Sequence, residues 1–479
     1  MGLYILICLK FMPVKKMHND INKIIEQSLN NCIPEEAEKI RLNLIAQRVK
    51  KLIIDYISVK HYSFVTDVVF GGSFAKGTWL KNDTDIDLFV KFESQIDFKS
   101  FENYGKEIGI KSLKNFSPYL KFADHPYVEA YVENIKINVV PCFDVKFGHW
   151  KSAADRSPFH TTYVVDTLDN HKKKQVIILK QFLKSLNIYG AEISTKGFSG
   201  YVSEVLIIKF GSFLSTLNYF SNFSIDKRII VIDTTSIDLE KLKKFDSFLI
   251  ILDPIDSNRN LGTAISSLTA GLLIQSSRMF LNNPTNDYFN YYKNISIDSS
   301  IMELFSFNVL IVEFKCSFRS PDVIWGQLQK FINSVSKSIE LNGFKILKKA
   351  CYTDEIEHCV FGFLMESIQI SKFQKRIGPD IFRKSDVEKF ILSNSVSKLK
   401  WLSSDTRINC ILCRKFTDVR EYLKFTFKNN PYLIGIPSDL KSDFLSSVRI
   451  YSIDQQENIS EHVGHTLSDL LHVDARLFN

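Results

Sequence analysis

The sequence predicts an α+β protein built from several domains. Three segments in the first third of the chain have the composition of strands: Val65–Phe70, Leu88–Phe92 and Ile135–Val140. From about residue 171 to residue 280 the apolar residues follow a mostly helical period. Beyond residue 281 both patterns occur, with a strand expected at Phe307–Phe314 and a helix at Pro321–Leu341. Helices and strands in this mixed order indicate the α+β class.

The first predicted helix begins near Pro34. A proline fits the first turn of a helix, and the acids Glu35 and Glu36 complement the helix dipole there. Apolar residues from Ile40 to Ile53 then continue at roughly helical spacing. We therefore expect a helix directly before the strand at Val65–Phe70.

Length and composition permit a globular enzyme and exclude little else. The 479 residues are enough for about two to four domains with a sizeable core. Hydrophobic residues at 45% and charged residues at 24% exclude wholesale disorder. The net charge of +8 permits a polyanionic partner without requiring one, and eight Cys are too few for a disulfide scaffold.

The N-terminal segment Met1–Val14 contains a short apolar run. It has no basic n-region and no clear small-residue cleavage site, so we interpret residues 1–16 as an extension rather than a signal peptide. The true start would then be Met12 or Met17. No window reaches about 18 uninterrupted apolar residues, so we expect no membrane span and a cytoplasmic location.

The most informative stretch is Phe70–Val90. A strand ends in two glycines, and Ser73 follows at a helix start, where N–H groups, a hydroxyl and the Lys76 ammonium can meet a phosphate. The spacing of a Walker loop is absent. Asp85 and Asp87 are two residues apart on the next strand, so both carboxylates face the same way and can meet a metal pair. Mg²⁺ accepts such carboxylates together with substrate phosphates.

This joint pattern resembles the nucleotidyltransferase superfamily, and Gly77–Val90 resembles the archaeal-type (class I) CCA-adding enzymes, the tRNA nucleotidyltransferases. The likeness extends over about residues 30 to 395. The further matching segments follow in the order of the family: His125–Val128, Val139–Cys142, Asp155–Thr161, Leu179–Phe182, Tyr189–Glu192, Gly197–Tyr201, Asp253–Asp256, Phe318–Gln327, Thr353–Glu355 and Arg376–Pro379.

The resemblance implies roles for individual residues. Asp85 and Asp87 match the metal-binding catalytic acids, with Mg²⁺ as the expected ion, and Ser73 and Lys76 match contacts to the triphosphate. The remaining matches to the nucleotide pocket are His160, Lys180, Tyr189 and Arg259. The implied activity is template-independent addition of C, C and A to the 3′ end of tRNA from CTP and ATP, by two-metal nucleotidyl transfer.

The resemblance also implies an order of domains and a set of partners. We expect a nucleotidyltransferase head with a mixed sheet at 17–152, a helical central neck at 153–280, and an α/β body and tail that binds tRNA at 281–479. The expected partners are the tRNA acceptor end, CTP and ATP, without a membrane. The oligomeric state stays open, with a homodimer as one alternative.

One position departs from the family pattern. Where a third carboxylate is expected, on the strand before Val139–Cys142, this chain has Asn138. An amide oxygen can contact Mg²⁺ but is neutral and cannot accept a proton, which would cost on the order of 10²–10⁴ in rate. Asp144 lies roughly 20 Å farther along an extended strand and should not substitute. A catalytically impaired or inactive RNA-binding paralogue is therefore the alternative, and a poly(A) polymerase is a rival among enzymes.

Three other groups of residues have structural interpretations. Cys410 and Cys413 form a C-x-x-C without a second pair at zinc-finger spacing, so we interpret them as ordinary thiols. His462, His465 and His472 we interpret as part of a solvated tail. The basic run of Lys172–Lys174 with Lys180 and Lys184 is typical of a solvated helix face, but beside this head it could contact the tRNA backbone.

Overall fold

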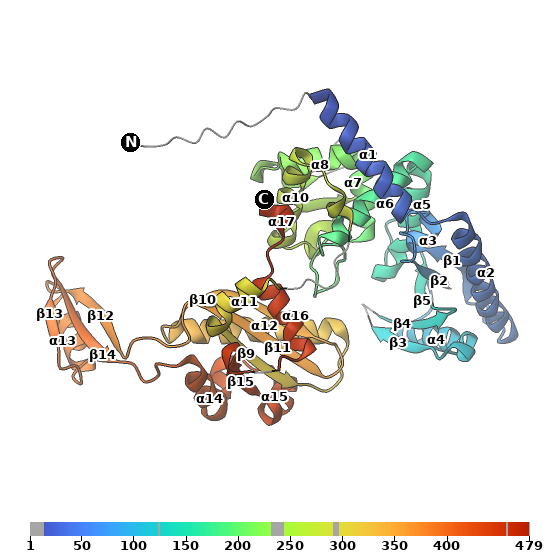
Figure 1. Cartoon of the computed structure of the whole chain (residues 1–479). Helices are drawn as coiled ribbons and strands as arrows, with labels where there is room; N and C mark the ends of the chain where they lie inside the picture. The colour runs from blue at the N-terminus through green and yellow to red at the C-terminus, as the bar shows by residue number, and fades with distance from the viewer. Residues whose placement is uncertain (1–13, 123–124, 231–243, 291–296, 457, 479) are drawn as a thin grey trace. The chain divides into compact units, whose positions relative to one another are not determined.

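The computed structural model describes residues 14–122, 125–230, 244–290, 297–456 and 458–478. Most of the predicted N-terminal extension lies outside these residues. The chain divides into two compact units: Met1–Lys293 together with Asp474–Asn479, and Asn294–Val473 (Figure 1). The helices and strands together confirm the α+β class. The four-domain division with boundaries at residues 16, 152 and 280 stays a prediction.

The first unit begins with a mixed five-stranded sheet. Its strands have the order β1-β2-β5-β4-β3, and only the β2–β5 pair is parallel. The strands are β1 (Val65–Gly71), β2 (Asp85–Glu93), β3 (Tyr119–Phe122), β4 (Pro126–Val132) and β5 (Ile135–Asp144). The three strands predicted from the sequence are therefore confirmed as parts of β1, β2 and β5.

One face of this sheet carries the core. Helices α2 (Glu36–Val59) and α4 (Phe98–Ser112) pack their apolar residues against Ile86, Leu88 and Ile137. Because side chains alternate along a strand, the residues between these point to the opposite face. That face therefore carries Asp85 and Asp87. The short helix α3 (Gly72–Lys76) connects β1 to the loop before β2.

The remainder of the first unit is mainly helical and has its own core. Phe182, Phe213 and Phe280 form the centre of this core. Its helices are α1 (Val14–Cys32), α5 (Arg156–Thr167), α6 (Asn170–Ser185), α7 (Gly200–Phe210), α8 (Phe213–Ser221), α10 (Ser267–Asn282) and α17 (Ala475–Phe478). A small sheet of β6 (Ile229–Ile230), β7 (Ile250–Asp253) and β8 (Asp256–Asn260) interrupts the predicted helical region.

Within the described residues, no helix taken alone has the length and apolar character that crossing a membrane requires. Helices α7 and α8 meet this requirement only as a pair, and they are bent by 90° at the break between them. Their apolar residues Val205, Leu206 and Leu217 belong to the buried core of the unit.

The second unit contains an antiparallel sheet with helices on both faces. The strand order is β10-β11-β9-β15, from β9 (Val309–Lys315), β10 (Ile346–Thr353), β11 (His358–Met365) and β15 (Arg449–Ser452). One face packs on α12 (Pro321–Leu341), α14 (Val419–Asn429) and α15 (Lys441–Ser447), the other on α11 (Ser299–Phe305) and α16 (Glu461–Leu471). The predicted helix at Pro321–Leu341 is confirmed, and the strand predicted at Phe307–Phe314 begins two residues later.

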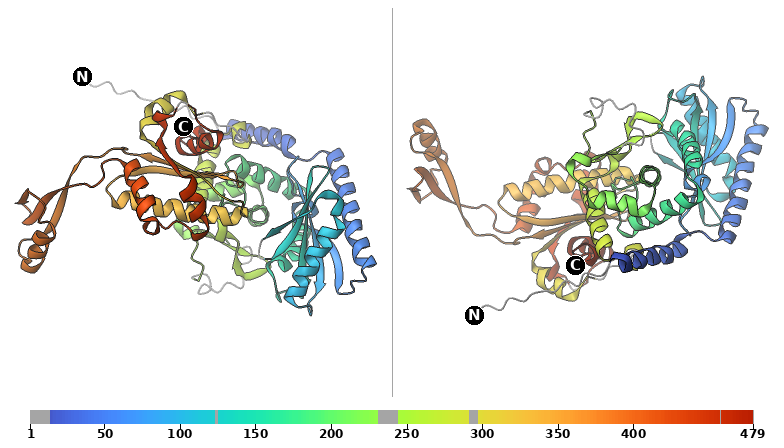
Figure 2. Two further views of the ribbon diagram at one scale, coloured as in Figure 1. Left: turned by 90° about the horizontal axis from the view of Figure 1, so that it is seen from below. Right: turned by 90° about the horizontal axis from the view of Figure 1, so that it is seen from above.

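A small three-stranded sheet extends from this second unit. It contains β12 (Phe373–Asp380), β13 (Lys400–Leu402) and β14 (Arg407–Cys413), with the helix α13 (Lys384–Ser393). Both views in Figure 2 show this small sheet set apart from the β9–β11 sheet, at the end of two connecting segments of the chain. Cys410 is buried and Cys413 is exposed on β14. The two thiols face opposite sides of the strand, which agrees with their interpretation as ordinary thiols.

The interpretation of the C-terminal histidines as part of a tail was wrong for His462 and His465, although the His465 side chain is 41% exposed. Both lie on α16, which packs Val463, Leu467 and Leu470 into a core between the helix and the sheet. The apolar spacing on this helix was a signal that could have been recognised in the sequence.

Candidate active site

The two acids of β2 lie at the beginning of that strand, on the face of the sheet away from its core. In the parallel pairing of β2 with β5, Asp85 lies opposite Lys136 and Asp87 lies opposite Asn138. Both acids therefore share one face of the sheet with two side chains of β5, as the spacing in the sequence predicted for the acids themselves.

Each of these acids is bound by its partner on β5. The Lys136 Nζ lies 2.5 Å from Oδ2 of Asp85, and the Asn138 Nδ2 donates a 2.8 Å hydrogen bond to Oδ1 of Asp87. Burial raises the pKa of Asp87 above its ordinary value, because the bond from Asn138 and the nearby lysines only partly offset it. Burial acts to lower the pKa of Lys136, but the Asp85 carboxylate outweighs it and leaves that pKa raised.

Gly72 allows α3 to approach the acid pair. It has a φ of +64°, and a Cβ at this position would lie 1.8 Å from Oδ2 of Asp87. Only glycine avoids both the strained backbone and this clash. The first turn of α3, which carries Ser73, is consequently held beside the Asp87 carboxylate.

The donor set at this position fits a divalent cation. Asp85 and Asp87 offer carboxylate oxygens, and Oδ1 of Asn138 is buried without a hydrogen-bond partner in the described part of the chain. Hard oxygen donors of this kind are the ligands that Mg²⁺ prefers. Lys136 does not fit a cation site, since its ammonium is a positive charge that already forms an ion pair with one carboxylate oxygen of Asp85.

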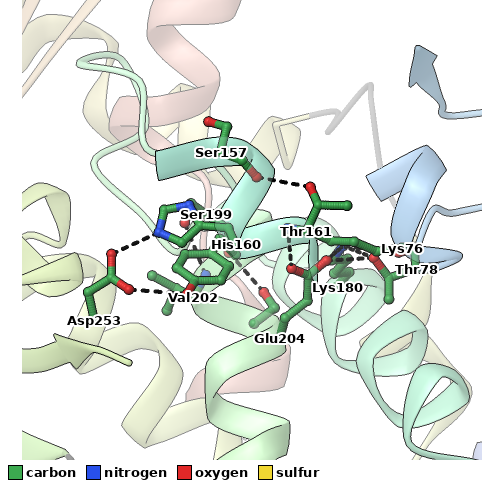
Figure 3. Close-up of polar contacts among 12 residues, drawn as sticks. Lys76, Thr78, Ser157, His160, Thr161, Lys180, Ser199, Val202, Glu204 and Asp253 are labelled. Carbon is green, nitrogen blue, oxygen red and sulfur yellow. Dashed lines mark hydrogen bonds and ion pairs between the residues drawn. The ribbon is translucent and has the colours of Figure 1, made fainter. Parts of the chain in front are cut away.

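A buried charge cluster lies on the other side of α3. Glu204 of α7 accepts hydrogen bonds from Lys76 Nζ at 2.8 Å, Thr78 Oγ1 at 2.6 Å and Lys180 Nζ at 3.2 Å. Figure 3 shows these three side chains converging on the single carboxylate from α3, the following loop and α6. Burial acts to raise the pKa of Glu204, but the two ammonium groups outweigh it and lower that pKa to about 2. The carboxylate is therefore charged and ties three segments together.

This cluster limits what its two lysines can contact. The Lys180 side chain is 1% exposed, and its ammonium also donates to the backbone oxygen and hydroxyl of Thr78. The Lys76 ammonium lies 4.9 Å from the centre of the Tyr201 ring. Their predicted contacts with nucleotide phosphates stay predictions, and in the structure both ammonium groups are bound by Glu204.

Two more of the predicted residues meet at Asp253, at the end of β7. His160 Nε2 lies 2.9 Å from Oδ2 of Asp253, Arg259 Nη1 lies 3.1 Å from the same oxygen, and the Tyr201 hydroxyl donates to Oδ1 at 3.1 Å. Burial lowers the pKa of His160 and outweighs the nearby carboxylate. His160 is thus a neutral imidazole at pH 7, oriented by its bond to Asp253.

Tyr189 lies between the chain segments of the buried cluster. Its backbone forms an isolated bridge with Phe198, and its hydroxyl faces Gly200 beside the Lys180 ammonium. Burial raises the pKa of its phenol. Tyr201 adjoins this region as well, since its ring lies 3.9 Å from the His160 ring and also faces Lys76. The predicted pocket residues therefore lie in connected groups around α3, α6 and α7.

Sequence reasoning did not identify Lys136, Tyr201, Glu204 or Asp253 as site residues. It also missed Glu129 of β4, which is 6% exposed and lies opposite Asn138. Lys136 could have been found, because it lies two residues before Asn138 on the same strand and so shares its face. Glu204 and Lys180 each interrupt an apolar helical run, which is the signal of paired buried charges. Glu129 gave no signal before its pairing with Asn138 was known.

Asp155 supports the connection from β5 to α5. Its carboxylate accepts hydrogen bonds from the backbone N–H groups of Phe143, Lys151 and Ser152 and from the Ser152 hydroxyl. Asp155 is almost fully buried, and it thereby fixes the segment that leads to His160.

Asp144, at the far end of β5, binds Lys91 at 2.6 Å and is opposite Glu93, well away from Asp85.

In the second unit, Asp354, His358 and His462 bring their ligand atoms within 4.8 Å of one another. One oxygen of Asp354 already accepts three backbone N–H groups of the turn that leads to β11. The two imidazole rings stack at 4.2 Å with an interplanar angle of 18°. Nitrogen lone pairs lie in the plane of each ring, so parallel stacked rings do not converge on one ion. We interpret this group as a turn cap with a ring stack.

The chain is similar to known protein families along most of its length. Family models described as nucleotidyltransferase domain, as tRNA nucleotidyltransferase second domain, and as CCA-adding enzyme C-terminal domain match residues 50–164, 174–290 and 307–435. A CCA-adding enzyme of Methanocaldococcus jannaschii is 32% identical over 87% of this chain and 93% of its own length. A CCA-adding enzyme of Sulfurisphaera tokodaii is 33% identical over 84% of this chain and 91% of its own.

Solved structures are similar only at a distance. A Cid1 poly(U) polymerase bound to MgATP covers 57% of this chain and 100% of its own, with a TM-score of 0.46 and 14% sequence identity. This likeness supports no argument about the site.

Proposed function

Since this chain belongs to the archaeal-type CCA-adding enzymes, a family of tRNA nucleotidyltransferases, we propose that it adds C, C and A to the 3′ end of tRNA from CTP and ATP without a template. The observation that carries this proposal is the 32% identity to a CCA-adding enzyme over 87% of the chain. A cytoplasmic location, and a homodimer as one form of the enzyme, stay part of the expectation.

In the proposed reaction, the terminal tRNA hydroxyl attacks the α-phosphorus of CTP or ATP. A new P–O bond forms, the bond to the β-phosphate oxygen breaks, and pyrophosphate leaves. Asp85 and Asp87 would hold Mg²⁺, which supplies positive charge beside the triphosphate. The structural support is that both carboxylates share one end of the sheet with Oδ1 of Asn138, which has no hydrogen-bond partner among the residues that the structure describes.

The nucleotide would lie along α3 and the adjoining helices. Ser73 is the residue proposed to contact the triphosphate beside Asp87. Lys76 and Lys180 would place their positive charges next to it from the Glu204 cluster. His160, Tyr189 and Arg259 are proposed to line the remainder of the pocket. The tRNA acceptor end would be bound through backbone charge and A-form shape.

The alternative is an impaired or inactive RNA-binding paralogue with the same fold. Two observations favour it, since β5 presents a neutral amide at Asn138 and an ammonium at Lys136 to the two acids. Asp85, Asp87 and their shared orientation favour the enzyme. The two readings differ in whether tRNA that binds is also extended.

The test is extension of tRNA that lacks its last three nucleotides. The purified chain is incubated with Mg²⁺ and tRNA in three reactions, with CTP alone, ATP alone or both, and product lengths are read on a sequencing gel. Addition of two C residues with CTP alone, and of one further A when ATP is also present, is the expected result. Long tracts with ATP alone would instead identify a poly(A) polymerase.

Two variants complete this experiment. Asp87→Asn should abolish extension and serves as the inactive control. Asn138→Asp restores the missing carboxylate and is expected to raise the rate, by up to on the order of 10²–10⁴. Extension by Asn138→Asp alone would identify an inactivated site on an intact enzyme. If the unmodified chain and Asn138→Asp both bind tRNA but neither extends it, the enzyme proposal is contradicted and the paralogue remains.

A further inference from the structure

Each acid of β2 is bound by a side chain of the neighbouring strand β5. Lys136 forms an ion pair with Asp85 at 2.5 Å, and Asn138 donates to Asp87 at 2.8 Å. Both contacts follow from the register of the parallel β2–β5 pair, which places each donor directly opposite its acid. The two carboxylates that would bind a cation therefore already have a cation and an amide donor.

The Lys136 ammonium offsets the negative charge of the Asp85 carboxylate, as a bound metal ion would. A divalent ion that binds Asp85 must displace Lys136 or remain beside its positive charge, and both cost free energy. The pair is partly buried, with the Lys136 side chain 33% exposed, so solvent screens it only in part. Binding of the ion and binding of the ammonium at Asp85 are consequently in competition.

A second carboxylate lies within reach for a displaced ammonium. Glu129 of β4 is opposite Asn138 in the antiparallel β4–β5 pair and so lies on the same face of the sheet. It is 6% exposed, and the Tyr119 hydroxyl donates to it. Lys136 is opposite Tyr131, the next residue of β4 on that face. Glu129 is therefore the diagonal cross-strand neighbour of Lys136, and such neighbours are about 7–8 Å apart, within reach of a long side chain.

We propose that Lys136 is a built-in competitor of the divalent cation at Asp85, and that cation binding moves its ammonium to Glu129. The inference rests on the proposed function in one respect, that the β2 acids are the cation site. It adds that this chain binds the cation weakly compared with what its two carboxylates alone would allow. Removal of the lysine charge should tighten cation binding.

The experiment measures Mn²⁺ binding to the full chain without nucleotide or RNA, from the electron paramagnetic resonance signal of free Mn²⁺. Lys136→Met, which keeps the apolar part of the side chain, should bind Mn²⁺ about tenfold more tightly than the unmodified chain. Lys136→Arg keeps the charge and should bind as the unmodified chain does. Asp87→Asn in each protein identifies the binding that belongs to the acid pair, and circular dichroism melting checks folding.

The matched control lies on the same two strands. Lys91 of β2 and Asp144 of β5 form a 2.6 Å ion pair at the opposite end of the sheet. Lys91→Met removes an equivalent charge from the same pair of strands and should leave Mn²⁺ affinity unchanged. Equal tightening by Lys91→Met, or an affinity of Lys136→Met within twofold of the unmodified chain, would overturn the proposal.

Glu129→Gln tests the second step. If Glu129 receives the ammonium, this variant should weaken Mn²⁺ binding about threefold in the unmodified chain and leave it unchanged in Lys136→Met. Equal weakening in both would overturn the transfer to Glu129. Failure to detect any binding that depends on Asp87 in either protein would overturn the whole inference, and the extension assay would still decide CCA addition separately.

Discussion

Loss of the Glu204 charge is expected to destabilise the first unit strongly. Its carboxylate is 1% exposed and binds two ammonium groups, on side chains that are 7% and 1% exposed for Lys76 and Lys180. Glu204→Gln keeps the shape and removes the charge, which leaves two buried ammonium groups without an anion. Removal of one partner from a buried pair costs about 3–5 kcal/mol.

The lowered pKa of Glu204 gives an order-of-magnitude figure for the stabilisation that its ionisation contributes. It falls from an ordinary 4.5 to about 2 in the folded chain. A difference of this size corresponds to a stabilisation on the order of 3 kcal/mol at neutral pH. Because the folded pKa lies below the unfolded one, the stabilisation is complete above about pH 4.5 and is lost as the pH falls toward 2.

The assay is thermal unfolding followed by calorimetry, on the unmodified chain and on Glu204→Gln. The first unit has close to 300 residues, so a loss of about 3–5 kcal/mol should lower its Tm by about 5–8 °C at pH 7. The difference in Tm between the unmodified chain and Glu204→Gln should decrease on acidification below pH 4.5. The control is Glu35→Gln, at an exposed pair with Lys81 in which the Glu35 side chain is 68% exposed, and it should change the Tm little.

Two results would refute this reasoning. The first is an equal loss of stability in Glu204→Gln and in the triple replacement of Lys76, Lys180 and Glu204 by Met, which would mean that charge is irrelevant. The triple variant is expected to lose less stability than Glu204→Gln, because it leaves no unpaired charge buried. A Tm of Glu204→Gln within about 2 °C of the unmodified chain would equally contradict the role of the cluster.

Three further predictions concern the segments around the site. Gly72→Ala should reduce tRNA extension at least about tenfold in the gel assay, because its φ of +64° costs about 1–2 kcal/mol for alanine and its Cβ would clash with Asp87; activity equal to the unmodified chain would contradict this. The pKa of His160 is lowered in the folded chain, so on acidification the unfolded chain binds the proton at a higher pH than the folded chain does. The free energy of unfolding should therefore fall as the pH drops from 7 to 5. In urea unfolding, the free energy of unfolding of His160→Gln should fall less over this pH range than that of the unmodified chain. An equal dependence on pH would count against a buried neutral imidazole. Asp155→Asn should cost at least about 2 kcal/mol in urea unfolding, because one amide cannot accept all the N–H bonds that the carboxylate does; an unchanged midpoint would show that these bonds are dispensable.

The sequence alone was sufficient for features that depend on local geometry. The strand at Val65–Gly71, the helix Pro321–Leu341 and the shared direction of Asp85 and Asp87 follow from residue period and spacing. The same rule places Lys136 on the face of Asn138, although its partner could not be known. Where apolar spacing on α16 was not recognised, the prediction of a solvated tail was wrong.

The partners across the site were decided only by the tertiary structure. Lys136 meets Asp85 because β5 lies beside β2 in parallel, although β3 and β4 come between them in the sequence. Glu204 meets Lys76 across 128 residues of chain. The sequence determined which side chains share a face, since that depends on the period of one strand or helix. Which faces meet depends on strand order and helix packing, which are set by burial across the whole unit, so no local pattern could show that each acid of β2 already has a partner on β5.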